Sequence, residues 1–227
     1  MKKVILLILS IITSSFLTAQ EDSTGRPDYI HGGTYLKIGA VIPVGDYANG
    51  QTIPFDYPPV DQLSYLPARS GAALDLGFII YIGPSFANKY LRAGIDATFF
   101  SFWFNSTRPP DRTYLYEKYY SFIGQKFGPI LTVNPVDRLM IDFSYKLNAN
   151  FAYHDELDGW APLADVTTSE YGYSLTGNEV SMNIRYRVML FSFQYNFGTM
   201  NYNNADKENY DQEIKINTFR ILLGFKF

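Results

Sequence analysis

The chain has 227 residues, a formal net charge of −3, no cysteine, and 19 Tyr and 18 Phe residues. Its acidic balance argues against a nucleic-acid partner, because nucleic-acid-binding proteins present basic surfaces. The lack of cysteine excludes disulfides, thiolate metal sites and a lipidated N-terminal cysteine. Beyond the N-terminus, no run of about 20 apolar residues predicts a transmembrane helix. An aromatic-rich chain without such runs suits a transmembrane β-barrel, in which each strand shows only every second residue to lipid.

Residues 1–19 are expected to be a secretory signal peptide. Two lysines form a basic start, residues 4–9 begin an apolar stretch, and residues 17–19 offer a cleavage site before Gln20. The alternative is an uncleaved membrane anchor. It is disfavoured because the apolar stretch is shorter than the ~18 residues of a spanning helix and is interrupted by serine and threonine. Cleavage removes both lysines and changes the formal net charge from −3 to −5.

A short periplasmic N-terminal segment is expected at residues 20–33, followed by one barrel domain at residues 34–227. The evidence for the barrel is a strict two-residue alternation, which is clearest in residues 139–151. There, apolar residues such as Phe143 alternate with polar residues such as Asp142. A helix, with its period of 3.6 residues, would scatter both sets around its surface, so the pattern predicts strands with two different faces.

Eight antiparallel strands are expected, joined alternately by long and short links. This rhythm is typical of outer-membrane barrels, which have long extracellular loops and short periplasmic turns. Both ends of the barrel then lie on the short-turn side, which requires an even number of strands. The expected strands span residues 34–44, 71–82, 90–103, 119–133, 139–151, 175–188, 191–200 and 214–227.

The small and charged residues of these strands are expected to face the interior, and the bulky residues to face lipid. A soluble lipocalin-like barrel would reverse the faces, but a narrow eight-stranded interior has least room for bulk. A basic residue facing lipid would cost about 2–4 kcal/mol at mid-bilayer. Trp103 is expected on the lipid side, with Ser101 and Gln125 as polar exceptions. The expected interior network comprises Lys37, Asp75, Arg92, Asp96, Lys126, Asp142, Lys146, Arg185, Arg187 and Arg220.

The expected interior has an excess of positive charge. With Lys226 included, the inward set contains eight basic and three acidic residues, a net charge of +5. Isolated buried charge is very costly, so these cations need partners. The candidates are interior Tyr and Asn groups, water, Glu179 at the rim, or acidic loops folded inward. A water-containing ionic core is favoured over an anion path, because side chains nearly fill an eight-stranded barrel.

The C-terminal strand carries the most specific short motif. Apolar or aromatic residues occupy every second position up to the last residue, which is Phe. This pattern resembles the signal that outer-membrane barrels present to the barrel-assembly machinery during biogenesis. The residues of the expected signal are Phe219, Ile221, Leu223, Phe225 and Phe227.

Three further motifs are similar to small outer-membrane barrels of the Bacteroidota, a group that includes PorT-like and OmpX-like proteins. They are Gln20 after the cleavage site, residues 124–129 leading to Asn134 and Pro135, and residues 195–198. The resemblance implies a location in the cell outer membrane of a Gram-negative bacterium, in contact with lipid and lipopolysaccharide. PorT-like proteins are linked to protein secretion, so the resemblance also implies a protein partner, whose identity stays open.

No enzyme active site is recognisable, and no catalytic residue, cofactor or dedicated metal site is expected. His31 is expected in a solvated terminus and His154 in a solvated loop. A pairing of His154 with Ser174 stays open, because catalytic triads are defined by geometry and not by sequence order. The acidic loop at residues 152–174 lacks the spacing of a calcium-binding loop. Whether it binds divalent ions stays open.

The leading hypothesis is a non-enzymatic barrel whose loops or lipid-facing wall contact a protein partner. The first long loop, residues 45–70, combines prolines with Tyr47, Phe55, Tyr57 and Tyr65. Aromatic residues on proline-stiffened segments suit an interaction surface, although an extended aromatic girdle explains them equally well. The alternatives are a narrow channel for small solutes and, third, a lipid-modifying outer-membrane enzyme.

Overall fold

The computed structural model describes residues 30–49, 51–52, 64–65, 68–107, 118–136, 138–156, 170–204 and 211–227. The predicted signal peptide and most of the predicted periplasmic segment lie outside the described residues. Two β-sheets and one short helix are formed by the described part of the chain.

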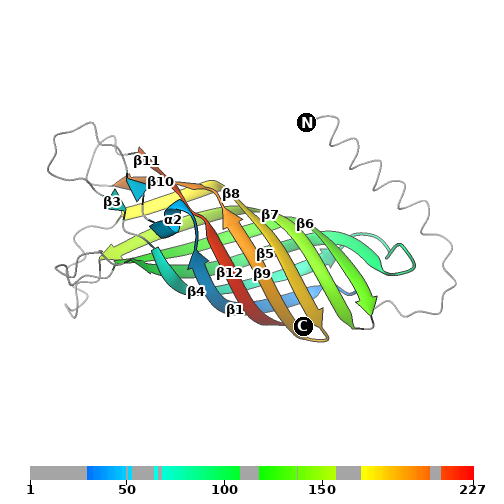
Figure 1. Cartoon of the computed structure of the whole chain (residues 1–227). Helices are drawn as coiled ribbons and strands as arrows, with labels where there is room; N and C mark the ends of the chain where they lie inside the picture. The colour runs from blue at the N-terminus through cyan, green and yellow to red at the C-terminus, as the bar shows by residue number, and fades with distance from the viewer. Residues whose placement is uncertain are drawn as a thin grey trace, which may run out of the picture.

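Eight of the described strands close into an antiparallel barrel (Figure 1). Each strand pairs with its neighbours along the chain, and the last strand pairs with the first, so the ring has no open edge. The all-β, eight-stranded barrel predicted from the alternation is therefore confirmed. The barrel strands are β1 (Gly33–Pro43), β4 (Ala68–Tyr81), β5 (Leu91–Thr107), β6 (Lys118–Val136), β7 (Leu139–Glu156), β8 (Glu170–Tyr186), β9 (Met189–Phe197) and β12 (Thr218–Lys226).

The remaining elements gather at one end of the barrel, the long-loop end (Figure 1). They are α2 (Asp46–Asn49), the small pair β2 (Gln51–Thr52) and β3 (Ser64–Tyr65), and a hairpin of β10 (Thr199–Asn204) and β11 (Asp211–Lys215). The hairpin continues β9 and β12, so the last two predicted strands are each divided in two. No helix in the described part of the chain is long and apolar enough to cross a membrane.

The opposite end, the short-turn end, holds the tight links and the C-terminus (Figure 1). The link from β4 to β5 contains three consecutive left-handed residues, Ala87, Asn88 and Lys89, with φ of 48°, 55° and 65°. The link from β8 to β9 is a turn at Arg187 and Val188, with φ of 56° at Arg187. The alternation of long and short links matches the sequence-based expectation.

A bulge in β5 reverses which face its residues present. Two residues of β5, Phe99 and Phe100, together oppose the single residue Gln125 of β6. The extra residue shifts the two-residue alternation by one position. Beyond the bulge, Ser101 and Trp103 are therefore buried inside, at 0% and 2% exposure. The prediction that both face lipid is wrong, whereas Gln125 does face outward.

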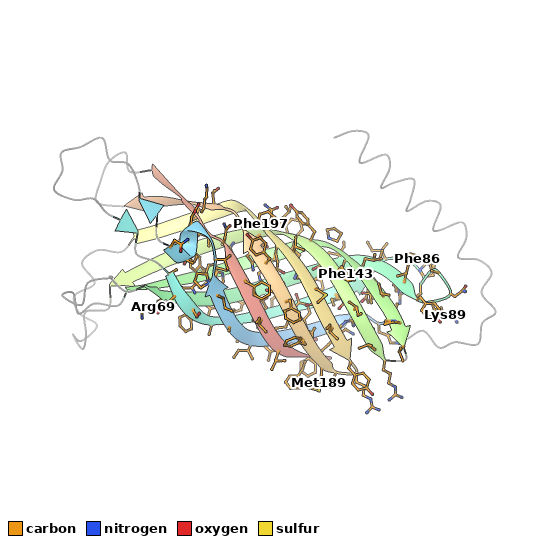
Figure 2. All side chains as sticks on the ribbon, viewed as in Figure 1. Arg69, Phe86, Lys89, Phe143, Met189 and Phe197 are labelled. Atoms are coloured by element: carbon orange, nitrogen blue, oxygen red, sulfur yellow. The ribbon has the colours of Figure 1, made fainter. Side chains whose placement is uncertain are left out.

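The outer face of the barrel is a continuous apolar belt, along which Phe143, Met189 and Phe197 lie (Figure 2). Phe143 is 50% and Met189 is 61% exposed, as expected of side chains that face hydrocarbon. Among the described residues of the barrel strands that are exposed, Arg69, at the long-loop end of β4, is the one Lys, Arg, Asp or Glu. An apolar wall around a charged interior is the arrangement of a transmembrane barrel. The chain therefore has the architecture of an integral transmembrane barrel.

Candidate functional site

A chain of ion pairs crosses the middle of the barrel interior. Lys126 Nζ lies 3.1 Å from Asp75 Oδ2 and 2.8 Å from Glu179 Oε2. Lys146 Nζ lies 2.9 Å from Asp96 Oδ2 and 3.1 Å from Glu179 Oε1. Glu179 thus joins the two lysines, and each lysine also has its own aspartate. The five side chains come from five consecutive barrel strands, β4 to β8, and all are buried.

Strand register explains how these charges meet. Every second residue of a strand points inward, and directly opposed residues on neighbouring strands share a face. Lys146 of β7 lies opposite Glu179 of β8, and Lys37 of β1 lies opposite Asp75 of β4. Contacts between strands that are not neighbours, such as Lys126 with Asp75, require the closed ring as well.

Asp75 collects further donors around its carboxylate. Ser101 Oγ donates a hydrogen bond of 2.7 Å to Oδ1, and Gln194 Nε2 donates one of 3.1 Å to Oδ2. Arg220 Nη1 lies 3.8 Å from Oδ1. Ser101 reaches Asp75 only because the bulge in β5 turns it inward. The carboxylate is therefore held by groups from β5, β6, β9 and β12, and it links strands on opposite sides of the barrel.

A second ionic cluster lies nearer the short-turn end. Arg185 donates two hydrogen bonds to Asp142, from Nε to Oδ2 at 2.6 Å and from Nη2 to Oδ1 at 2.8 Å. Thr132 Oγ1 also donates to Asp142 Oδ1 at 2.6 Å, and Arg185 Nη2 donates to the Tyr81 hydroxyl at 2.6 Å. A bidentate Arg–carboxylate pair of this kind is among the strongest side-chain interactions, and it fixes the orientation of the two groups.

At the long-loop end, the interior is closed by apolar and aromatic side chains. The rings of Trp103 and Phe122 stack with centroids 3.5 Å apart, and the Arg220 guanidinium lies 4.7 Å from the Trp103 ring. Tyr47 of α2 is 7% exposed and belongs to the same apolar cluster as Met200. Burial raises the pKa of the Tyr47 hydroxyl. Tyr47 therefore caps the barrel, so its prediction as part of an exposed aromatic surface or girdle is wrong.

Most of the predicted interior network lies inside the barrel. Arg92 instead lies at the mouth of the short-turn end, where its Nη1 donates to the Ile30 carbonyl at 2.6 Å. Arg187 is exposed in the turn after β8, 5.6 Å from the Tyr186 ring, so its interior placement is wrong. The reason is that β8 ends at Tyr186, two residues before the expected end of the strand at residue 188. The predicted residues found buried inside are Lys37, Asp75, Asp96, Lys126, Asp142, Lys146, Arg185 and Arg220.

The interior is close to neutral. Among the described residues, five basic and four acidic side chains are buried in it, a net charge of +1 where +5 was expected. Glu179, predicted at the rim, lies at the centre of the network. Arg92, Arg187 and Lys226 lie at the short-turn end instead, where Lys226 Nζ donates to the His31 carbonyl at 2.7 Å. Lys37 Nζ has no hydrogen-bond partner among the described residues, but it lies 4.5 Å from the Tyr35 ring.

The described interior offers no water-lined path. The nine buried charged residues are each at most 1% exposed, whereas residues that line an open pore are accessible to solvent. One interior cavity, of about 20 Å³, lies beside Trp103, Asn148 and Arg220. That volume holds about one water molecule.

In the described part of the chain, no three His, Asp or Glu side chains gather so that they could hold a metal ion. In the register of β7 and β8, His154 lies opposite Glu170, and Ser174 lies opposite Asn150. Four residues of strand separate Ser174 from the residue opposite His154, which is about 13 Å at 3.3 Å per residue. The backbone register therefore does not place His154 and Ser174 opposite each other. Most of the acidic loop lies outside the described residues.

The residues of the expected assembly signal form a row on the outer wall of β12. Leu223, Phe225 and Phe227 are 58%, 53% and 76% exposed. The backbone N–H of Phe227 donates to the carbonyl of Thr34 at 2.8 Å, which ties the end of the chain to β1. The row is therefore available to a partner in the membrane.

No protein-family model and no curated protein matches the chain. Among solved structures, it is similar to Ail, the attachment invasion locus protein of Yersinia pestis, in complex with the heparin analogue sucrose octasulfate. That alignment covers 87% of this chain and all of the other, with 11% identity and a TM-score of 0.42. The backbone structure of Ail in a phospholipid bilayer nanodisc gives 13% identity over the same shares, with a TM-score of 0.37.

Proposed function

We propose that the chain is a non-enzymatic outer-membrane barrel that acts as an interaction or accessory subunit and not as a channel. The main support is the buried ion-pair chain through Lys126, Glu179 and Lys146. A path through the interior would require these paired side chains, which are buried and fill the middle of the barrel, to move apart. Contacts with other molecules then fall to the loops, the protruding strands and the outer wall.

The sequence resemblance to PorT-like barrels gives this role a concrete form. In it, the chain is an accessory subunit of a protein-secretion or surface-assembly apparatus, with a protein as its partner. The first long loop supports this, because its prolines and aromatic residues suit an interaction surface at low ordering cost. In the described structure, the loop carries its own two-stranded sheet of β2 and β3, which is separate from the barrel sheet.

This separation allows a sharp test. Replacing residues 50–66 with a short Gly-Ser linker keeps α2 and its Tyr47 cap, and it leaves every barrel strand whole. The shortened barrel should still fold, shown by a gel mobility shift on boiling, because closure rests on strand pairing. Chemical crosslinking in cells should lose the partner bands that the wild type gives. The matched control replaces residues 205–210 between β10 and β11 with a short turn and should keep those bands.

Other outcomes separate the remaining functions. If loop replacement changes no crosslink and the purified wild type conducts ions, the channel hypothesis replaces the proposed one. If the protein modifies lipid and His154→Ala abolishes that activity in a folded barrel, the enzyme hypothesis replaces it.

We also propose that the barrel-assembly machinery recognises the row on β12. Phe227→Asp should lower the amount of protein in the outer-membrane fraction, because a charge at the last position disrupts the row. Val136→Asp is the matched control: Val136 ends β6 at the same end of the barrel and is 62% exposed. Equal loss in both variants would show a general cost of charge at this end and would contradict a specific signal.

A further inference from the structure

A groove of about 660 Å³ runs along the outer wall where β5, β6 and β7 meet the link from β4 to β5. Its lining side chains are apolar, apart from the hydroxyl of Tyr145. That hydroxyl already donates to Asn178 Oδ1 at 2.5 Å, so its proton is engaged. The groove therefore offers an apolar occupant close contact and a polar occupant almost no hydrogen bond.

Small residues on neighbouring strands make the floor. Ala93 of β5 and Pro129 of β6 face outward and line the groove. Their bulkier neighbours form its sides: Phe127 is 59% exposed and Leu147 is 48% exposed. The hollow thus follows from an alanine and a proline placed among large apolar residues on the same face.

The link from β4 to β5 closes the groove at the short-turn end. Pro84 and Phe86 belong to its lining, and Figure 2 shows Phe86 beside Lys89 at that end of the barrel. Phe86 is held by paired backbone hydrogen bonds with Leu91, of 2.8 and 3.1 Å. The turn between these two residues contains the three left-handed residues described above. Left-handed conformations are unfavourable for residues other than glycine, so the surrounding contacts fix a particular shape for this link.

We propose that this groove binds an acyl chain of a phospholipid from the leaflet at the short-turn end. The groove lies within the apolar belt and is continuous with the surface that already faces lipid, so hydrocarbon is the medium that meets it. Its volume falls in the range of specific small-molecule pockets, about 300–1,000 Å³. Lys89 in the adjoining turn adds a positive charge near the membrane surface, which favours a phosphate headgroup.

A second copy of the barrel fits the groove less well. A neighbouring barrel presents a convex wall, which would rest on the rim at Phe127 and Leu147 and leave the floor at Ala93 uncovered. A single acyl chain can follow the floor along its length. The inference requires that the barrel spans a membrane, and it is independent of the protein partner in the proposed function.

The test fills the groove from its floor. Wild type, Ala93→Phe and the control Ala40→Phe are reconstituted in vesicles of phosphatidylethanolamine and phosphatidylglycerol, then transferred to mild detergent. Ala40 is an outward-facing alanine of β1 and does not line the groove. Native mass spectrometry should show a retained phospholipid on the wild type and on Ala40→Phe. Ala93→Phe should lower the retained fraction about tenfold, which corresponds to about 1.4 kcal/mol of binding free energy.

Folding is checked in each variant by the gel mobility shift on boiling, and Ala93→Leu replaces Ala93→Phe if the latter does not fold. Equal retention in the groove variant and the control would overturn the proposal. A wild type that carries no lipid but has the mass of two chains, and that becomes a single chain on Ala93→Phe, would overturn it in favour of a second copy.

Discussion

The two faces of β7 differ in how they stabilise the barrel. On the inner face, Asp142 and Lys146 each have named partners at hydrogen-bonding distance. On the outer face, Phe143 and Leu147 are about half exposed and meet hydrocarbon without specific partners. The inner face therefore depends on which residues are present, and the outer face depends mainly on their being apolar. A shift of one residue along the strand moves a side chain from the inner face to the outer face, or the reverse.

The largest expected effect comes from the centre of the inner face. Glu179→Ala should lower the free energy of unfolding by about 3–5 kcal/mol, because Lys126 and Lys146 then share too little negative charge. Urea unfolding of the barrel in lipid vesicles measures this loss. Ser144→Ala is the control for the loss of an uncharged contact. It removes a hydroxyl hydrogen bond with Ser181 and should cost about 0.5–1.5 kcal/mol.

A double variant separates charge from packing at this site. Lys126→Met in the Glu179→Ala background removes one of the two cations that lose Glu179, while Asp75 keeps its contacts with Ser101, Gln194 and Arg220. It should therefore recover part of the loss. If the second substitution only adds to the loss, the cost at Glu179 arises from the missing volume and not from unpaired charge.

On the outer face, Phe143→Arg should lower the free energy of unfolding by about 2–4 kcal/mol, because a cation replaces an aromatic ring in hydrocarbon. Phe143→Leu should stay close to the wild type, since both residues suit lipid. The same unfolding assay applies. Similar stability of the two variants would place Phe143 outside the apolar belt.

Ser101 tests whether the bulge reverses the faces of β5. Inside the barrel, Ser101→Ala removes a hydrogen bond to the Asp75 carboxylate and should cost about 1.5–3 kcal/mol. Simple alternation puts Ser101 on the lipid face, where the same change would be neutral or stabilising. Ser121→Ala, at an outward position of β6, is the control and should have little effect. An equally small effect at Ser101 would argue against the bulge.

The smallest effect is expected outside the membrane, at the long-loop end. Lys215 Nζ lies 3.5 Å from Asp46 Oδ2, and both side chains are about 60% exposed. Exposed pairs of this kind contribute about 0–1 kcal/mol and are screened by salt. Asp46→Asn should therefore change stability by less than about 1 kcal/mol, with a smaller difference at high salt. A larger loss would mean that α2 depends on this pair and not on the buried Tyr47.

Alternation was sufficient to predict the strands and most of the interior charges, because the two-residue period follows directly from strand geometry. It failed where the period is interrupted or ends. The bulge at Phe99 and Phe100 leaves no sign in the alternation, since two adjacent apolar residues fit either face. Arg187 follows the inward-facing Arg185 by two positions, so alternation places it inside, but it lies beyond the end of β8.

Predicting the ion-pair network required more than knowing which strand positions face inward. Glu179 was expected at the rim because β8 was expected to begin near residue 175, whereas it begins at Glu170. The contact of Lys126 with Asp75 joins strands that are not neighbours, so it depends on how the ring closes. The groove depends on the conformation of the β4–β5 link, which local sequence does not specify.

The filled, charge-paired interior is tested most directly by ion conductance of the purified wild-type barrel in planar bilayers. A closed interior predicts no steady current above that of the protein-free bilayer. Steady single-channel currents that change in size when Lys126 is replaced by Gln would contradict it, because they would place Lys126 beside an open path for ions.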